Sequence, residues 1–189
     1  MLKALGLLAV AVIAGLVWWL IRHEEVPEPG GSADSSRPTS SRPAGDFRTA
    51  VAPVRDASCT GHAYGKIRGF FARTDCQQLS RALYTTTKEG HKTLVSVAVV
   101  EMRTAADAKR LKRLTDTDGT GNVADLVREG KAPMPNAPEV SGGGYASRLA
   151  GRYVTIVESQ AFDKAAGDEL LGRISTNALR LAGQVSGTR

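Results

Sequence analysis

The sequence predicts an α+β fold in which two β-hairpins form one antiparallel sheet with helices packed on one face. Valine-rich or alternating runs at residues 93–102 and 152–159 each follow a shorter β-prone run and a turn. After each hairpin, apolar residues recur three or four positions apart, as they do on the buried stripe of a helix. Two short helices are expected ahead of this ββα-ββα order, and one transmembrane helix is expected ahead of those.

The predicted transmembrane helix rests on an apolar segment, residues 4–21, that has no charged or strongly polar side chain. A helix of these eighteen residues spans about 27 Å, which is close to the hydrocarbon thickness of a bilayer. Trp18 and Trp19 lie at its end, where indole rings favour the headgroup level. We therefore expect residues 1–22 to anchor the chain in a membrane.

A cleaved secretory signal peptide is the alternative interpretation of the same segment. Signal peptides have a shorter apolar region, followed by small residues at the cleavage site. Here the apolar run ends in bulky residues, Trp18 to Ile21, which favours an uncleaved anchor. Lys3 precedes the run and favours a cytoplasmic N-terminus, with the C-terminal part outside the cytosol.

Residues 23–56 are expected to be a flexible linker rich in proline and serine. The segment contains five prolines, the pair Gly30-Gly31 and few apolar residues, which follow no period. Such a composition cannot bury a core and is typical of an extended spacer. The remaining residues, 57–189, are then expected to form a single extracytoplasmic α+β domain.

The two cysteines, Cys59 and Cys76, both lie in this predicted domain. An even number of cysteines in an exported domain predicts a disulfide, which would stabilise a loop of this size by about 3 kcal/mol. Two buried free thiols in a cytosolic domain are the alternative. A zinc site is not expected, because the cysteines and the distant histidines lack the spacing of ligand pairs.

The expected elements of the first half of the domain are two helices, a hairpin and a longer helix. Residues 64–71 have helical spacing, and a second short helix is expected after Asp75, with Leu79 and Leu83 on its inner side. A β-prone run at 84–87 and a turn then lead into the strand at 93–102, which is rich in valine and expected at the centre of the sheet.

The third helix is expected at residues 104–114, and a long connection rich in proline and glycine follows it. The second hairpin joins residues 145–149 and 152–159 through a turn at Ala150-Gly151. A last helix is predicted from about Lys164 to Gly183, with Asp163 as its N-terminal cap.

The loop after the third helix resembles a calcium-binding loop in its pattern. Oxygen-bearing side chains alternate at Asp116, Asp118 and Thr120, and Gly121 occupies the sixth position. The position that normally supplies a bidentate glutamate is Val127, so calcium affinity is expected to be poor. The alternative is that these residues form the turns that end the helix, and no metal ion is expected.

Four cations, Lys109, Arg110, Lys112 and Arg113, lie close together on the predicted third helix. They define a possible anion-binding face. A helix face that is merely solvated is the alternative interpretation.

The basic character belongs to the domain rather than to the linker. Residues 57–189 contain 19 Lys and Arg against 13 Asp and Glu, whereas residues 22–56 contain five against six. Outside the cytosol, the expected partners are an envelope protein, an anionic polymer or an anionic lipid. Nucleic acid is not expected, because no aromatic side chains are interleaved with the cations to stack on bases.

No catalytic residue can be assigned from the sequence. His62 and His91 have no nucleophile motif beside them, and the motifs of serine hydrolases, zinc proteases and phosphate-binding loops are all missing. No cofactor is expected.

Several segments together resemble a group of membrane-anchored proteins. They are the pair Cys59 and Cys76, the strand 95–101 that leads into residues 105–108, and the loop 116–122. The chain resembles uncharacterised membrane-anchored proteins of high-GC actinobacteria over about residues 55–183. In its general features the predicted domain is also similar to the disulfide-bonded extracytoplasmic sensor domains of some mycobacterial receptor kinases. Because the sequence contains no kinase domain, the resemblance implies location and disulfide but no activity.

Three functional hypotheses follow from these observations. The first is a non-enzymatic binding or interaction module on the outer face of the membrane. The second is an enzyme of the cell envelope, for which a cleft lined by His62 or His91 with convergent acids would be the evidence. The third is an accessory subunit of a membrane complex, which predicts a contiguous apolar patch on the domain or on one flank of the anchor.

Overall fold

The computed structural model of the protein describes residues 46–187. The transmembrane anchor predicted at residues 1–22 and most of the linker predicted at 23–56 lie outside this part of the chain. Within residues 46–187, no helix has the length and apolar character needed to cross a bilayer.

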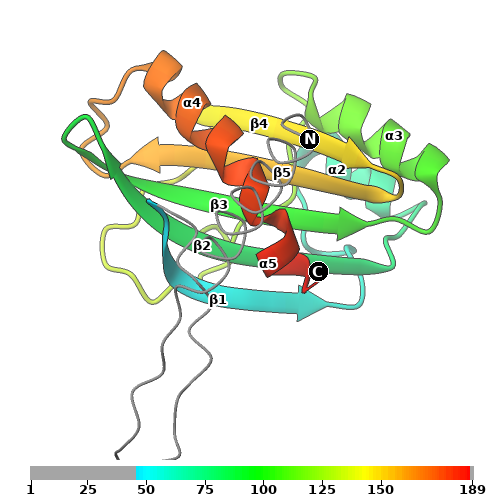
Figure 1. Cartoon of the computed structure of the whole chain (residues 1–189). Coiled ribbons are helices and arrows are strands. Elements are labelled where there is room, and N and C mark those ends of the chain that lie inside the picture. The colour runs from blue at the N-terminus through cyan, green and yellow to red at the C-terminus, as the bar shows by residue number, and fades with distance from the viewer. Residues whose placement is uncertain (1–45, 188–189) are drawn as a thin grey trace, which may run out of the picture. The chain divides into compact units, whose positions relative to one another are not determined.

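The described residues form an α+β fold built on a five-stranded antiparallel sheet (Figure 1). Its strands are β1 (Arg48–Asp56), β2 (Gln78–Lys88), β3 (His91–Glu101), β4 (Gly144–Ala150) and β5 (Tyr153–Ala161), in the spatial order β1-β2-β3-β5-β4. The two predicted hairpins, β2–β3 and β4–β5, are confirmed, and so is the central position of β3.

Helices cover both faces of this sheet, so the prediction of helices on one face is wrong. In Figure 1, α4 (Asp168–Ala178) and α5 (Ala182–Ser186) lie in front of the sheet, and α2 (Gly65–Phe71) lies behind it. The helix α3 (Ala105–Thr115) packs on the same face as α2. A short 3-10 helix, η1 (Leu179–Leu181), links α4 to α5.

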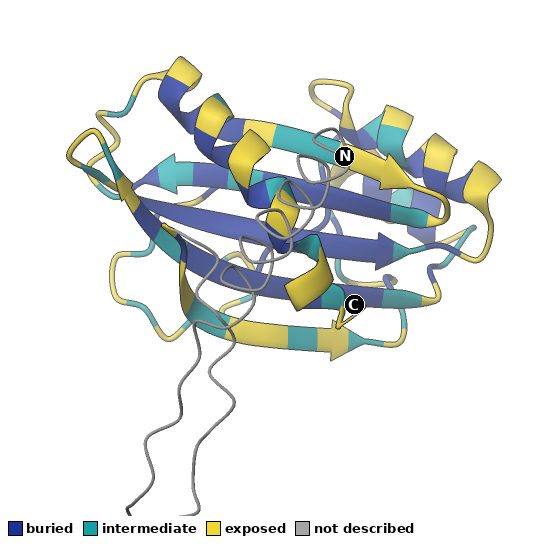
Figure 2. Cartoon of the chain, in the orientation of Figure 1, coloured by how far each residue is buried: buried dark blue, intermediate teal, exposed yellow. Residues whose placement is uncertain are grey.

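Helices are needed on both faces because β3 is apolar and is buried along almost its whole length (Figure 2). Val95, Val97 and Val99 pack against α4 and α5, whereas Ala98 and Val100 pack against α2 and α3. Because successive side chains of a strand point to opposite faces, a continuous apolar run requires cover on both.

The second short helix, predicted after Asp75, is not present. Residues 78–83 belong to β2, which pairs with β3 without interruption from Gln78↔Glu101 to Lys88↔His91. Leu79 and Leu83 are four positions apart, a spacing that fits one face of either a helix or a strand. The long-range pairing with β3 decides between the two.

The folded region also begins earlier than the predicted boundary at residue 57. Arg48–Asp56 form the edge strand β1, which pairs with β2 and contains two shifts of register. Val51 and Val54 pack on the core, while most of the strand stays partly or fully exposed. Pro53 is tolerated because an edge strand need not donate every N–H to a neighbour. Ala50, Val51 and Ala52 form only a short apolar run before Pro53, which is why the sequence predicted a linker.

The helix α3 is confirmed almost at its predicted bounds, but the last helix starts later than predicted. Thr104 caps α3 by accepting a hydrogen bond from the Asp107 N–H at 3.1 Å. Asp163 caps no helix: its carboxylate accepts from the Ala165 N–H and contacts the His91 ring. Lys164 has a φ of 55°, in the left-handed region, so the chain cannot be helical there.

A long connection, residues 116–143, joins α3 to β4 and covers the face of the sheet beside α2 and α3. Its Leu126 and Val140 pack on Leu83 and Leu94 of the sheet. The connection therefore contributes to the core, although it contains no helix and only one isolated β-bridge, between Ala63 and Val123.

Backbone contacts hold the start of α2 against this connection. The N–H of Tyr64 donates to Asn122 O at 3.0 Å, and the N–H of Lys66 donates to Thr120 O at 2.7 Å. Gly65 and Gly121 face each other with φ values of 62° and 83°, and a Cβ at Gly65 would lie 2.5 Å from Thr120 O. Only glycine permits this approach, which fixes α2 beside the end of α3.

Cys59 and Cys76 form the predicted disulfide, with their Cα atoms 5.5 Å apart. Both residues are fully buried. The Asp75 carboxylate accepts hydrogen bonds from the N–H groups of Cys59 and Cys76, each at 2.8 Å, and from the Ser58 hydroxyl. The two ends of the α2 segment are thus joined covalently and by hydrogen bonds.

Replacing both cysteines, Cys59→Ala with Cys76→Ala, is expected to lower the free energy of unfolding by about 3 kcal/mol, because the unfolded chain loses its cross-link. Urea unfolding followed by circular dichroism measures this change. The unaltered chain unfolded in a strong reductant serves as the control and should match the double variant. Equal stability of the oxidised chain and the double variant would contradict the prediction.

Candidate functional site

A shallow groove of about 470 Å³ lies between α2 and α3. Seven residues line it: Phe70, Arg73, Thr74, Arg110, Arg113, Leu114 and Thr117. Three of the seven are arginines and none is acidic. The groove therefore presents three positive charges and no negative one to an incoming ligand.

One wall of the groove is formed where α2 ends. Phe70 and Phe71 are buried and pack edge to face, with ring centroids 5.6 Å apart. The chain then turns, and the N–H groups of Arg73 and Thr74 both donate to Phe70 O. Burial of the aromatic pair thus places Arg73 and Thr74 at the rim of the domain.

The other wall is the outer side of α3. Ala108 and Leu111 are fully buried, so positions 110 and 113 fall on the opposite, solvent-facing side of the helix. Leu114 is partly buried and packs against the core at the floor of the groove.

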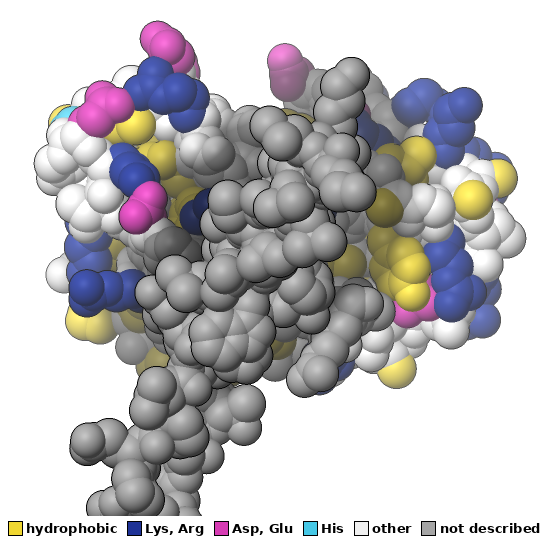
Figure 3. Space-filling view, viewed as in Figure 1, with side chains coloured by type: hydrophobic (Ala, Val, Ile, Leu, Met, Phe, Trp, Pro, Cys, Tyr) yellow, Lys and Arg dark blue, Asp and Glu magenta, His cyan; other side chains and the backbone are white. Residues whose placement is uncertain are grey.

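The structure divides the predicted anion-binding face. Arg110 and Arg113 line the groove, whereas Lys109 and Lys112 do not. Lys112 instead pairs with Asp116, one turn further along α3, with Nζ and Oδ2 at 2.5 Å. In Figure 3, Lys and Arg side chains gather over α3.

Sequence reasoning missed Arg73, the third cation of the groove. Arg73 is separated from Arg110 by a hairpin, and nothing in the sequence states that α2 and α3 pack together. The available signal was indirect: Arg73 and Thr74 follow a short helix with a strongly apolar face, a position that tends to be exposed beside the core.

The three arginines differ in how firmly they are held. Arg110 forms an ion pair with Asp107, whose carboxylate also accepts from the Thr104 hydroxyl at 2.6 Å. The hydrogen bonds from Thr104 and Arg110 hold the pKa of Asp107 below its usual value. Arg73 and Arg113 form no ion pair with any acidic side chain among residues 46–187. Their charge is therefore free to meet an external anion.

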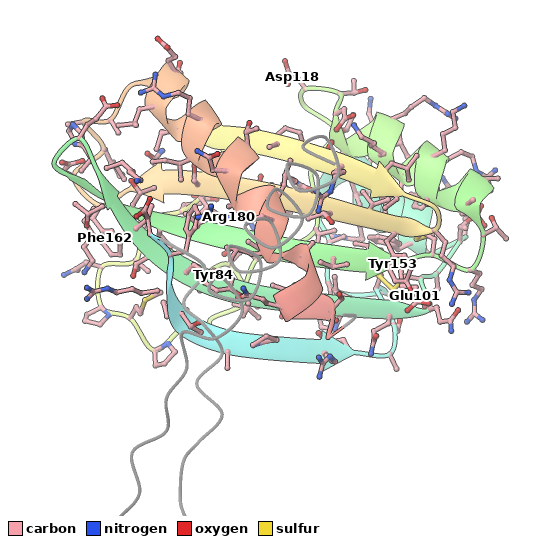
Figure 4. All side chains as sticks on the ribbon, viewed as in Figure 1. Tyr84, Glu101, Asp118, Tyr153, Phe162 and Arg180 are labelled. Atoms are coloured by element: carbon pink, nitrogen blue, oxygen red, sulfur yellow. A yellow bond between two sulfur atoms is a disulfide. The ribbon has the colours of Figure 1, made fainter. Side chains whose placement is uncertain are left out.

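Two of the three residues considered for calcium, Asp116 and Thr120, are engaged in other contacts. Asp116 accepts from the Tyr145 hydroxyl at 2.9 Å and the Ser147 hydroxyl at 2.6 Å, which ties the end of α3 to β4. Thr120 is buried, and its hydroxyl donates to Leu114 O at 2.5 Å. Asp118 lies at the tip of the loop (Figure 4).

Among the described residues, the acidic and thiol groups that come close enough to share a metal ion are Cys59, Asp75 and Cys76. Their two sulfur atoms are already bonded to each other. Because a thiolate, not a disulfide, is the metal ligand, this group is structural.

His62 lies in a cluster of charged residues that joins β1 and β2 to the long connection. Arg81 of β2 is completely buried, and its guanidinium contacts Asp56 Oδ2 at 2.8 Å and Glu129 Oε1 at 2.5 Å. The His62 ring contacts the same Glu129 oxygen at 2.8 Å. The acids around His62 are therefore already paired with a buried cation.

Glu129 remains ionised in this cluster. Burial by itself would raise the pKa of Glu129, but hydrogen bonds from Arg81, Lys131 and His62 outweigh it and lower the pKa to about 2. A carboxylate held this firmly as an anion is a poor general base. The cluster is better explained as a clamp on the edge strand β1 than as a catalytic site.

A second polar cluster surrounds Glu158 of β5, beneath the long connection. Burial raises the pKa of Glu158 to about 7, against an opposing hydrogen bond from Asn122. The nearby Asp125 and Glu139 raise it further, and Arg128 lowers it. Arg128 also stacks over the Tyr64 ring, 4.1 Å from its centroid, and pairs with Glu139.

No protein-family model matches the chain, and comparisons with curated proteins and with solved structures found no match either. The functional assignment therefore rests on the geometry of the groove and of the two polar clusters.

Replacing Glu158 with glutamine is expected to change how stability depends on pH. The pKa of Glu158 in the folded chain, about 7, lies above its ordinary value of 4.5, so the fold favours the protonated carboxyl. The stabilisation of the fold by the protonated Glu158 carboxyl is complete below about pH 4.5 and is lost as pH rises through 7. Between pH 5 and pH 8 the free energy of unfolding of the unaltered chain should therefore fall by about 2 kcal/mol more than that of Glu158→Gln.

Urea unfolding at the two pH values measures this difference. Glu139→Gln is the matched control, because the Glu139 side chain is 65% exposed and its removal should leave most of the pH dependence in place. A Glu158→Gln variant that loses as much stability as the unaltered chain would contradict the prediction.

Proposed function

We propose that the protein is a membrane-tethered, extracytoplasmic binding module that holds an anionic partner in the groove between α2 and α3. The observation that carries this proposal is the meeting of Arg73, Arg110 and Arg113 in one groove with no acidic side chain in its lining. The module has no catalytic role in this proposal.

The strength of the contact depends on all three arginines acting on one anion. Arg73, Arg110 and Arg113 are exposed, and a single exposed ion pair contributes roughly 0–1 kcal/mol, which would not support binding. Three such pairs together correspond to a dissociation constant of roughly millimolar or weaker, so the groove suits an anion that carries several charges.

Two observations support the location. The uncharged apolar segment at residues 4–21 has the length of a membrane-spanning helix. The disulfide between Cys59 and Cys76 favours an oxidising compartment, because cytosolic thiols are kept reduced. An anchor with a cytoplasmic N-terminus would place the domain in such a compartment.

The two other hypotheses have less support. An envelope enzyme built on His62 would need free acids beside the ring, but Asp56 and Glu129 are paired with Arg81. An accessory subunit that binds through its domain would need a contiguous apolar patch there, whereas the exposed large apolar side chains of residues 46–187 are Tyr145 and Leu149; the flank of the anchor, the other expected contact surface, lies outside these residues.

Variants that each remove one charge test whether binding depends on the groove or on the rest of the basic surface. Arg73→Ala and Arg113→Ala should each weaken binding of fluorescent dextran sulfate to the full-length chain in detergent by up to about fivefold, because each removes one exposed ion pair worth up to about 1 kcal/mol. Lys109→Ala is the matched control: it removes one charge from the same helix but lies outside the groove.

Fluorescence anisotropy at constant ionic strength measures the three affinities. If Lys109→Ala weakens binding as much as Arg113→Ala, the affinity comes from diffuse surface charge, and the groove is not the site.

The proposed topology is tested by labelling intact cells with a membrane-impermeant maleimide. Because Cys59 and Cys76 are fully buried, a reporter at the exposed position Lys164→Cys is used, and it should be labelled without lysis. Leu2→Cys is the control on the cytoplasmic side and should be labelled only after lysis. A Lys164→Cys reporter that reacts only after lysis would place the domain in the cytosol and refute the location.

A further inference from the structure

The chemistry of the groove also indicates the class of anion. Resting on the proposed function, we infer that the groove selects a phosphate-bearing ligand over a carboxylate-bearing one. The inference follows from the donors that line the groove and from the two walls that carry them.

Hydrogen-bond donors dominate the groove. The guanidinium groups of Arg73 and Arg113 have no acidic partner among residues 46–187, and Arg110 keeps N–H groups beyond those used by Asp107. The Thr117 hydroxyl already donates to Arg113 O at 2.8 Å, which leaves the Thr74 hydroxyl as a fourth donor.

Strong acceptors are missing from the lining, which contains no carboxylate, side-chain amide or imidazole. A sugar or a peptide brings its own O–H or N–H groups into a site, and these would lose their water without gaining a partner. A phosphate group presents mainly acceptor oxygens and matches a lining made of donors. The lining therefore disfavours ligands that must donate.

The directions of the donors favour a tetrahedral group over a planar one. A carboxylate has two oxygens in one plane, and a single guanidinium satisfies both of them. In the groove, Arg73 approaches from the α2 side and Arg110 and Arg113 from the α3 side. A phosphate group can accept from both walls at once, because its terminal oxygens point in several directions.

One of the arginines is held in advance of binding. Arg110 is paired with Asp107, which is itself fixed by the Thr104 hydroxyl and by the cap of α3. A guanidinium that is already ordered loses less conformational freedom when the ligand arrives. Arg110 thus positions one side of the phosphate, and the more mobile charges of Arg73 and Arg113 close around it.

A phosphate group can belong to a lipid headgroup or to a soluble or polymeric ligand, and both present the same acceptor oxygens. The donors of the groove fit either source, so the test includes a probe for each.

The test compares three probes on the full-length chain in zwitterionic detergent micelles, using isothermal titration calorimetry at fixed ionic strength. The probes are inorganic tripolyphosphate, citrate as a polycarboxylate, and phosphatidic acid incorporated in the micelles. We expect tripolyphosphate to bind at least tenfold more tightly than citrate, and phosphatidic acid tests whether a lipid headgroup supplies the same phosphate.

Two variants connect the preference to the groove. Arg113→Ala should abolish the difference between tripolyphosphate and citrate. Arg73→Lys keeps the charge but loses the planar fork of donors, so it should reduce the preference while leaving general attraction to anions in place. Lys109→Ala should change neither value, and circular dichroism checks that every variant is folded.

The outcomes separate the inference from the proposed function. Equal affinity for tripolyphosphate and citrate, both sensitive to Arg113→Ala, would overturn the phosphate preference and leave the anion-binding groove in place. Binding of phosphatidic acid that Arg113→Ala weakens would support the phosphate preference and identify a lipid headgroup as a source of the phosphate. No binding of any probe, or binding unaffected by the groove variants, would overturn the proposed function itself.

Discussion

Burial of β3 on both faces is the constraint on which the rest of the structure depends. Val97 and its odd-numbered neighbours need the cover of α4 and α5, whereas Val100 needs that of α2 and α3. Because α2 and α3 must share one face, they lie side by side there. Their outer surfaces then meet in a groove, and this packing brings the cations of the α2 and α3 segments together in its lining.

Much of the fold could be predicted because it depends on local pattern: the hairpins, α3 and the disulfide all follow from runs of a few residues. The failures lie where long-range contacts decide. Leu79 and Leu83 fit a helix or a strand equally well until β3 pairs with them. The edge strand β1 looks like a linker because an edge needs few apolar residues.

The candidate site shows the same division. Arg110 and Arg113 are recognisable as a charged stretch of one helix, but the groove also requires Arg73, which depends on how α2 and α3 pack. The packing in turn depends on the backbone contact between Gly65 and Gly121, which a single sequence does not reveal. Glu158 was missed for a related reason: its burial is produced by a connection distant in the sequence.

The edge strand β1 has a consequence for where a protease can cut the chain without damaging the domain. A cut ahead of Arg48 would leave the sheet intact. A cut after Asp56 would instead remove β1, strip Arg81 of one of its two carboxylate partners and bare the N–H and C=O groups of β2. Such an edge pairs readily with other chains, so the truncated domain would be prone to aggregate. Cleavage that preserves the folded domain is therefore confined to the segment before β1.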